Sequence, residues 1–149
     1  MTGSKTLRVI VALDALLMAY GHAPLSLFLS SFFRTGAPPP RLPPTGMPPG
    51  GFGFFFAIGA FFLFATIIYV LGAIFVASGK LFKLANIGLI IMAAVDNILL
   101  IYTRTVAGNV FFNRAFSWSW DWFPRLGTVQ VLVGQFIIIV LCAVLYKSK

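Results

Sequence analysis

Three polar side chains interrupt stretches of the sequence that are otherwise apolar: His22, Asp96 and Gln135. They lie within "LLMAYGH", "AAVDNILLIYTR" and "VLVGQFIII". An imidazole, a carboxylate and a carboxamide can bond one another, hold a proton or contact a cofactor. Counted along helices at about 1.5 Å per residue, His22 lies roughly 20 Å and Asp96 roughly 18 Å from one end, and Gln135 reaches about the same depth. We therefore predict a buried polar layer of His22, Asp96 and Gln135, with Asn97 beside it.

Asp96 needs a partner at this depth. A carboxylate at the centre of a transmembrane helix costs about 2.5–3.5 kcal/mol on insertion scales, so Asp96 must face the bundle interior or another subunit. His22 is its natural partner within the chain. Three uses of the layer are open: hydrogen bonds that fix the register of the helices, a proton or ion path, and contact of His22 with a haem or a quinone. Because the chain has one histidine, bis-histidine ligation of haem would need a ligand from another subunit.

Four apolar segments carry these residues, at roughly 7–33, 52–78, 84–103 and 127–146. The chain is 60% hydrophobic and 9% charged, whereas soluble domains carry about 25% charged residues. Each segment reaches the roughly 20 residues that a helix needs to cross a bilayer. In lipid, the backbone polar groups must be satisfied within the segment, which favours helix. The sequence predicts an all-α membrane protein, a single integral membrane domain over 1–149, with four helices running up-down-up-down.

The connections between these segments differ in composition. Pro24 lies midway along the first segment and predicts a kink there. The short basic stretch "GKLFK" at 79–83 predicts a tight antiparallel hairpin of the second and third helices. The other two connections are a proline-rich loop at 34–51 and a tryptophan-rich loop at 104–126. The second loop offers an interfacial anchor or a partner surface made of Trp118, Trp120 and Trp122.

The basic residues indicate the orientation. The net charge is +8, and the Lys and Arg residues lie in ones and twos at the ends of apolar runs. That placement is typical of membrane topology and excludes a nucleic-acid surface; anionic lipid headgroups are the expected partners. We predict both termini on the inner side of a prokaryotic plasma membrane or a mitochondrial inner membrane, with the proline-rich and tryptophan-rich loops outside. The inner side then holds Lys5, Arg8, Lys80, Lys83, Lys147 and Lys149.

Small residues on the second segment recur every four positions. Such spacing lets helices approach closely, and it predicts a helix-packing ridge. Tyr69 and Phe61 interrupt the ridge, which consists of Gly53, Ala57, Ala65, Ala73 and Ala77.

No set of residues suited to acid–base or nucleophilic catalysis stands in the sequence. It lacks HExxH, GxSxG and nucleotide-loop motifs, contains no glutamate, and has Cys142 as its only cysteine. We expect no enzyme activity of the isolated chain, no metal, and no cofactor beyond bound lipid. The leading prediction is an accessory subunit of a multisubunit membrane complex of an energy-converting, respiratory type. The alternatives are a small transporter, channel or redox-anchor subunit that uses the polar layer, and a homo-oligomeric four-span organiser.

Overall fold

The computed structural model describes residues 2–34, 51–105 and 128–147, and the side-chain surroundings of residues 5–23, 57, 59–102 and 129–147. This part of the chain consists of four helices: α1 (Thr2–Arg34), α2 (Gly51–Ser78), α3 (Phe82–Thr105) and α5 (Thr128–Lys147). Each contains a span long and apolar enough to cross a membrane. The prediction of an all-α integral membrane protein is therefore confirmed.

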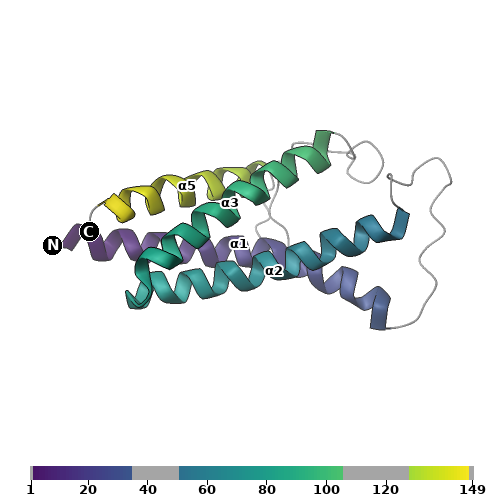
Figure 1. Cartoon of the computed structure of the whole chain (residues 1–149), viewed down its shortest axis with the longest axis horizontal. Helices are drawn as coiled ribbons and strands as arrows, with labels where there is room; N and C mark the ends of the chain where they lie inside the picture. Colours follow the sequence, from purple (N-terminus) through teal and green to yellow (C-terminus); the bar gives the residue numbers. More distant parts are fainter. Residues whose placement is uncertain (1, 35–50, 106–127, 148–149) are drawn as a thin grey trace.

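The helices alternate in direction. Figure 1 shows the start of α1, the end of α5 and the α2–α3 turn at the same end of the bundle. Around the bundle, α1 packs on α2, α2 on α3, α3 on α5, and α5 on α1. This is the predicted up-down-up-down arrangement. The proline-rich loop and the residues Trp118, Trp120 and Trp122 lie outside the described residues.

Helix α1 starts about five residues before its predicted apolar segment and passes through Pro24 without interruption. Its C-terminal part is inclined to its N-terminal part in Figure 1. A proline removes one backbone hydrogen bond and crowds the preceding turn, so an inclined second half is the expected shape. The kink at Pro24 itself stays a prediction, because its side chain is outside the described surroundings.

The α2–α3 turn is shorter than the predicted stretch, since α3 already begins at Phe82. Gly79 ends α2 with φ +72°, a left-handed conformation that glycine adopts without penalty, and its N–H donates to the Val76 carbonyl at 3.3 Å. Leu81 is also left-handed, with φ +47°. A leucine is strained in this conformation, so packing at the turn must hold it there. The turn brings α2 and α3 back as direct neighbours.

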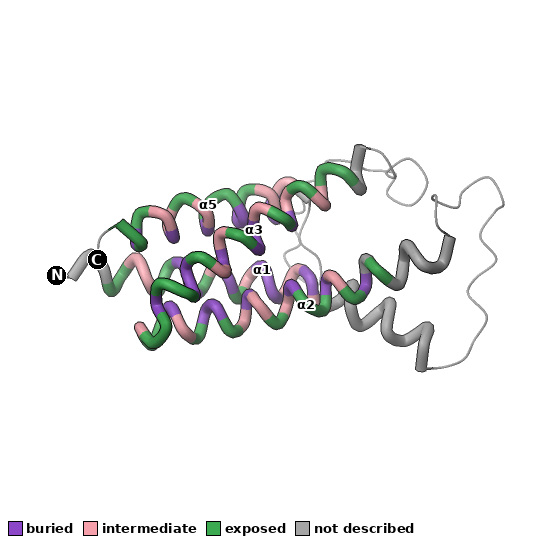
Figure 2. The backbone as a smooth tube through the Cα atoms, in the orientation of Figure 1, coloured by how far each residue is buried: buried purple, intermediate pink, exposed green. Residues whose placement is uncertain are grey.

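Burial follows the inner faces of the four helices, as Figure 2 shows. The outward faces of the spans carry large apolar side chains such as Leu13, Phe64, Ile98 and Phe136, all exposed. A soluble protein would hide such side chains, whereas a membrane protein presents them to lipid. The core is mostly apolar, and its buried polar side chains are His22, Asn86, Asp96, Gln130 and Gln135.

The predicted small-residue ridge of α2 is only partly a packing face. Ala65 and Ala73 are buried, but Ala57 and Ala77 are exposed, and the surroundings of Gly53 are outside the description. A row of residues spaced by four is inclined to the helix axis, so it follows a neighbouring helix for only a few turns. The ends of the row therefore turn away from the interior of the bundle, and the prediction was wrong for Ala57 and Ala77 as packing residues within this bundle.

Two glycines provide the close contacts instead. A Cβ atom at Gly72 would lie 2.5 Å from Leu89 Cδ2, and one at Gly134 would lie 2.3 Å from Met18 Cε. No real Cβ sits this close to another carbon, so a larger residue at either glycine would force the Leu89 or Met18 side chain to move.

Candidate functional site

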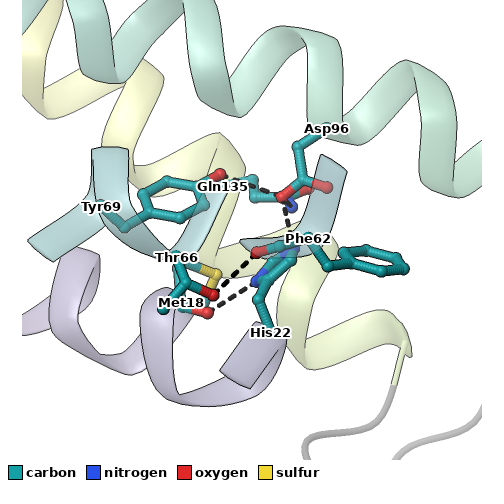
Figure 3. Close-up of polar contacts among 7 residues, drawn as sticks. All are labelled: Met18, His22, Phe62, Thr66, Tyr69, Asp96 and Gln135. Atoms are coloured by element: carbon teal, nitrogen blue, oxygen red, sulfur yellow. Dashed lines mark hydrogen bonds and ion pairs between the residues drawn. The ribbon is translucent and has the colours of Figure 1, made fainter. Parts of the chain in front are cut away.

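One polar side chain from each helix meets at the centre of the bundle. His22 comes from α1, Tyr69 from α2, Asp96 from α3 and Gln135 from α5. Their relative exposures are 4%, 0%, 1% and 0%, so lipid reaches none of them. Figure 3 shows the four side chains converging, and we call them the polar cluster.

Asp96 Oδ2 is the acceptor at the centre of the cluster. His22 Nε2 lies 2.8 Å from it, and the Tyr69 hydroxyl donates to it at 3.1 Å. The Gln135 amide N–H donates to the same oxygen. Three helices thus bond to one carboxylate on the fourth, which ties their relative depths together. The sum of these contacts offsets the cost of placing a carboxylate at this depth.

The hydrogen bonds of His22 define where its protons lie. Its Nδ1 is 2.7 Å from the Met18 carbonyl oxygen, one turn earlier on α1. A carbonyl only accepts, so Nδ1 carries a proton and donates. Nε2 then either donates to a carboxylate or accepts from a protonated Asp96. The pair shares one proton in both forms, and its net charge is zero in both. This neutrality suits a site that is enclosed by apolar side chains.

Aromatic rings hold the imidazole in place. The His22 ring centroid lies 5.2 Å from that of Phe62 and 5.6 Å from that of Tyr69. Both rings are tilted relative to the imidazole and lie at distances typical of favourable aromatic pairs. Thr66, on the same face of α2, donates its hydroxyl to the Phe62 carbonyl at 2.8 Å and so stays satisfied within its own helix.

Two buried acceptors of the cluster have no donor within the described part of the chain: Asp96 Oδ1 and Gln135 Oε1. Buried polar atoms are usually paired, so these two mark the one place in the cluster where a further donor would be stabilised. Both ring nitrogens of His22 are engaged. Iron ligation by His22 would therefore require one of its two contacts to break. Among the described residues, no group of three His, Cys, Asp or Glu side chains is placed to hold a metal ion.

No protein-family model matches this chain, and neither a curated protein nor a solved structure matches it. The functional interpretation therefore rests on the geometry of the cluster and the surface around it.

The structure brings together His22, Asp96 and Gln135, the three residues placed at one depth from the sequence. Asn97 lies one residue along α3, half-buried, and makes no hydrogen bond with them. One position along a helix is a rotation of about 100°, which turns Asn97 away from the face that carries Asp96.

Sequence reasoning missed Tyr69, which it treated only as an interruption of the small-residue ridge. Tyr69 lies nine residues before the end of α2, about 14 Å along the helix, which is shallower than Asp96. Side chains lean toward the N-terminus of their helix, and α2 runs toward the end that holds the termini. The long phenol therefore reaches deeper than its Cα, and that lean was the signal that would have placed its hydroxyl at the layer.

Two further polar residues lie nearer the end that holds the termini. Asn86 is fully buried and donates from Nδ2 to the Phe82 carbonyl at 3.0 Å, within its own helix. Asp14 is half-buried on α1 against Gly134 of α5, where an added Cβ would be 3.1 Å from its Oδ1. It is two helical turns from His22 along α1 and makes no hydrogen bond with the cluster residues.

Proposed function

We propose that this chain is a non-catalytic structural subunit of a multisubunit integral membrane complex. The observation that carries the proposal is that the polar cluster joins all four helices through one enclosed carboxylate. Its polar groups are mostly engaged with one another, and such a cluster fixes the register of helices rather than presenting a group to a substrate. The energy-converting class of complex, which was part of the leading prediction from the sequence, belongs to this proposal.

The surface of the bundle supports the same proposal. Each helix exposes large apolar side chains along its span, and such a surface meets either lipid or the spans of neighbouring subunits. One strongly exposed position on each helix can be used to detect a neighbouring protein: Leu13, Phe64, Ile98 and Phe136.

Site-specific photocrosslinking in the native membrane tests the proposal. A benzophenone amino acid replaces each of these four residues in turn, and adducts are separated by mass after irradiation. We expect at least one position to form a discrete adduct with a different membrane protein, and mass spectrometry then identifies the complex. An unirradiated sample of each variant is the control. Monomer alone at all four positions, together with migration as a small particle on a native gel, would refute the subunit proposal.

The same adducts address the homo-oligomeric alternative. Ala57 is small and exposed on α2, so it offers a point of close approach for a second copy. An adduct with twice the mass of the chain at Phe64, and at no other position, favours that alternative.

A second candidate function is proton transfer through the cluster. The shared proton of His22 and Asp96, and the two acceptors without a donor, favour it. In proteoliposomes with a pH-sensitive dye, a proton-conducting chain would collapse an imposed gradient, and Asp96→Asn would remove that conductance while Tyr146→Phe, on the exposed surface, would not. Wild-type vesicles as tight as empty vesicles would leave only the structural role.

The predicted orientation, with both termini inside, is part of the proposal. Cys142 is the only cysteine and is buried, so Cys142→Ser provides a cysteine-free background. In that background, Lys5→Cys and Lys147→Cys probe the two ends. Labelling by a membrane-impermeant maleimide only after the membrane is permeabilised supports termini inside; labelling of intact cells or mitoplasts overturns it.

A further inference from the structure

A groove on the outer surface between α2 and α3 has the features of a ligand site. Its volume is about 220 Å³, and side chains of both helices and of the turn line it with apolar atoms. The groove belongs to the hairpin and is separate from the polar cluster. Its walls include Ile68, Leu71 and Phe75 of α2, and Leu81, Leu84 and Gly88 of the turn and α3.

Two glycines of the hairpin show why the groove stays open. The space beside Gly72 is filled by Leu89, whose Cδ2 would lie 2.5 Å from an added Cβ. At Gly88, by contrast, nothing lies within 4 Å of an added Cβ. A helical glycine costs about 1 kcal/mol relative to alanine, and no contact within the bundle requires glycine at position 88. Its presence leaves the groove deep.

The groove ends at a basic turn. Lys80 and Lys83 flank Leu81, which lines the groove, and both lysines are exposed. Arg8 of α1 reaches the same turn: its Nη1 would lie 2.9 Å from a Cβ at Gly79, and its guanidinium carbon lies 4.6 Å from the Phe82 ring centroid. The turn itself contains no acidic residue, and the chain has three in all. A charged headgroup at this end would therefore meet cations.

We propose that the groove binds an anionic phospholipid, with one acyl chain between α2 and α3 and the phosphate at Lys80 and Lys83. The lining from Leu81 to Gly88 extends about 10 Å along α3, which places the start of an acyl chain beside the turn and its continuation toward the membrane centre. Lysines at a helix end reach the headgroup level while their stems cover apolar surface. Leu81 is held in a strained left-handed conformation, and its side chain lines the groove at the headgroup end. The lipid site is independent of the proposed subunit role.

Lipid retention by the full chain tests the site. The chain is reconstituted in nanodiscs that contain equal amounts of phosphatidylglycerol and phosphatidylcholine, released in the mass spectrometer, and scored for retained lipid. We expect wild type to retain one phosphatidylglycerol in preference to phosphatidylcholine. Lys80→Ser with Lys83→Ser reduces that preference about 25-fold, because each lysine near an anionic headgroup contributes on the order of 1 kcal/mol, or fivefold.

Matched variants separate the groove from general charge and bulk. Lys5→Ser with Lys147→Ser removes two charges at the same end, away from the groove, and retains the preference. Gly88→Leu adds bulk in the open space of the groove and lowers retention about fivefold, whereas Ala77→Leu adds similar bulk on the exposed surface of α2 and does not. Thermal unfolding of each variant in detergent shows whether it is folded.

Three outcomes would overturn the lipid site. They are equal retention of both lipids by wild type, equal losses from the two lysine pairs, and retention in Gly88→Leu equal to wild type. A benzophenone amino acid at Leu84 that crosslinks only to protein would assign the groove to a partner helix instead of a lipid.

Discussion

The polar cluster and the lipid-facing groove both involve α2 and α3, but they differ in packing: the cluster is enclosed, and the groove is open to the outside of the bundle. In the cluster, Tyr69 of α2 and Asp96 of α3 meet across a fully enclosed interface. In the groove, a few turns closer to the end that holds the termini, the same helices leave open space beside Gly88. One hairpin therefore encloses its polar atoms and leaves a hollow on its apolar outer side.

The difference has a physical origin in the solvent. A bilayer cannot hydrogen-bond to a carboxylate, so the helices must supply every donor for Asp96 themselves. An apolar cleft is filled by lipid chains at little cost, because lipid is as apolar as the side chains that line it. This bundle thus pairs most of the buried polar groups of its cluster with one another and tolerates a hollow in its outer surface.

Removing the acceptor of the cluster gives the largest expected effect. Asp96→Leu leaves His22, Tyr69 and Gln135 without their common acceptor. The expected loss of unfolding free energy lies between about 2 kcal/mol, from three bonds at the membrane average, and about 5 kcal/mol, the upper value for a broken buried pair. Steric trapping in bicelles measures it. A loss below that of an exposed-surface substitution such as Val140→Leu would contradict the central role of Asp96.

A double-mutant cycle sharpens this result. Adding His22→Leu to Asp96→Leu removes the histidine that the first substitution left unpaired. We expect the double variant to lose less unfolding free energy than the two single variants lose together, because replacing both partners of a buried pair by apolar groups is often neutral. Strictly additive losses would show that the pair is not coupled.

The next effect compares the closed and open parts of the hairpin. Gly72→Ala forces Leu89, which is fully buried, to move, and we expect a net loss of about 1–3 kcal/mol from overpacking. Gly88→Ala meets nothing and gains up to about 1 kcal/mol from helix propensity. Thermal unfolding in detergent therefore shifts in opposite directions for two identical substitutions. Shifts of the same sign would contradict the difference in packing between the two positions.

A smaller effect is expected at the basic end. Arg8→Met removes the cation above the Phe82 ring and costs about 0.5–1 kcal/mol. Lys5→Met removes a charge on the same helix from an exposed position, and it serves as the control. Differential scanning fluorimetry of the two variants measures the contrast, and equal melting temperatures would show that the cation–ring contact is not stabilising.

The smallest effect belongs to the Tyr69 hydroxyl of the cluster. Tyr69→Phe keeps the ring against His22 and removes one of the three donors to Asp96, which costs about 0.6 kcal/mol, the membrane average for one such bond. Tyr146→Phe, on the exposed surface of α5, controls for loss of a hydroxyl. A loss as large as that of Asp96→Leu would mean that the hydroxyl, rather than the carboxylate, organises the cluster.

The four spans, the hairpin and the level of His22, Asp96 and Gln135 were predictable because they depend on local properties. Length and apolar composition decide whether a segment spans lipid, and a constant rise per residue decides depth. On α2, by contrast, the inner and outer faces are almost equally apolar, so composition did not indicate which face of that helix turns inward. That is why Ala57 and Ala77 were assigned to a packing ridge although they are exposed.

The sequence by itself determined that this chain is a four-span membrane protein and that three polar groups share one depth. Tertiary structure alone decided that Tyr69 completes the cluster, that Gly72 rather than the alanine row brings α2 to α3, and that Gly88 faces open space. Those outcomes depend on contacts between residues far apart along the chain, 27 positions for Tyr69 and Asp96 and 39 for Gln135 and Asp96. The rotation of each helix about its axis settles such contacts, and in lipid that rotation is selected by packing and hydrogen bonding between helices.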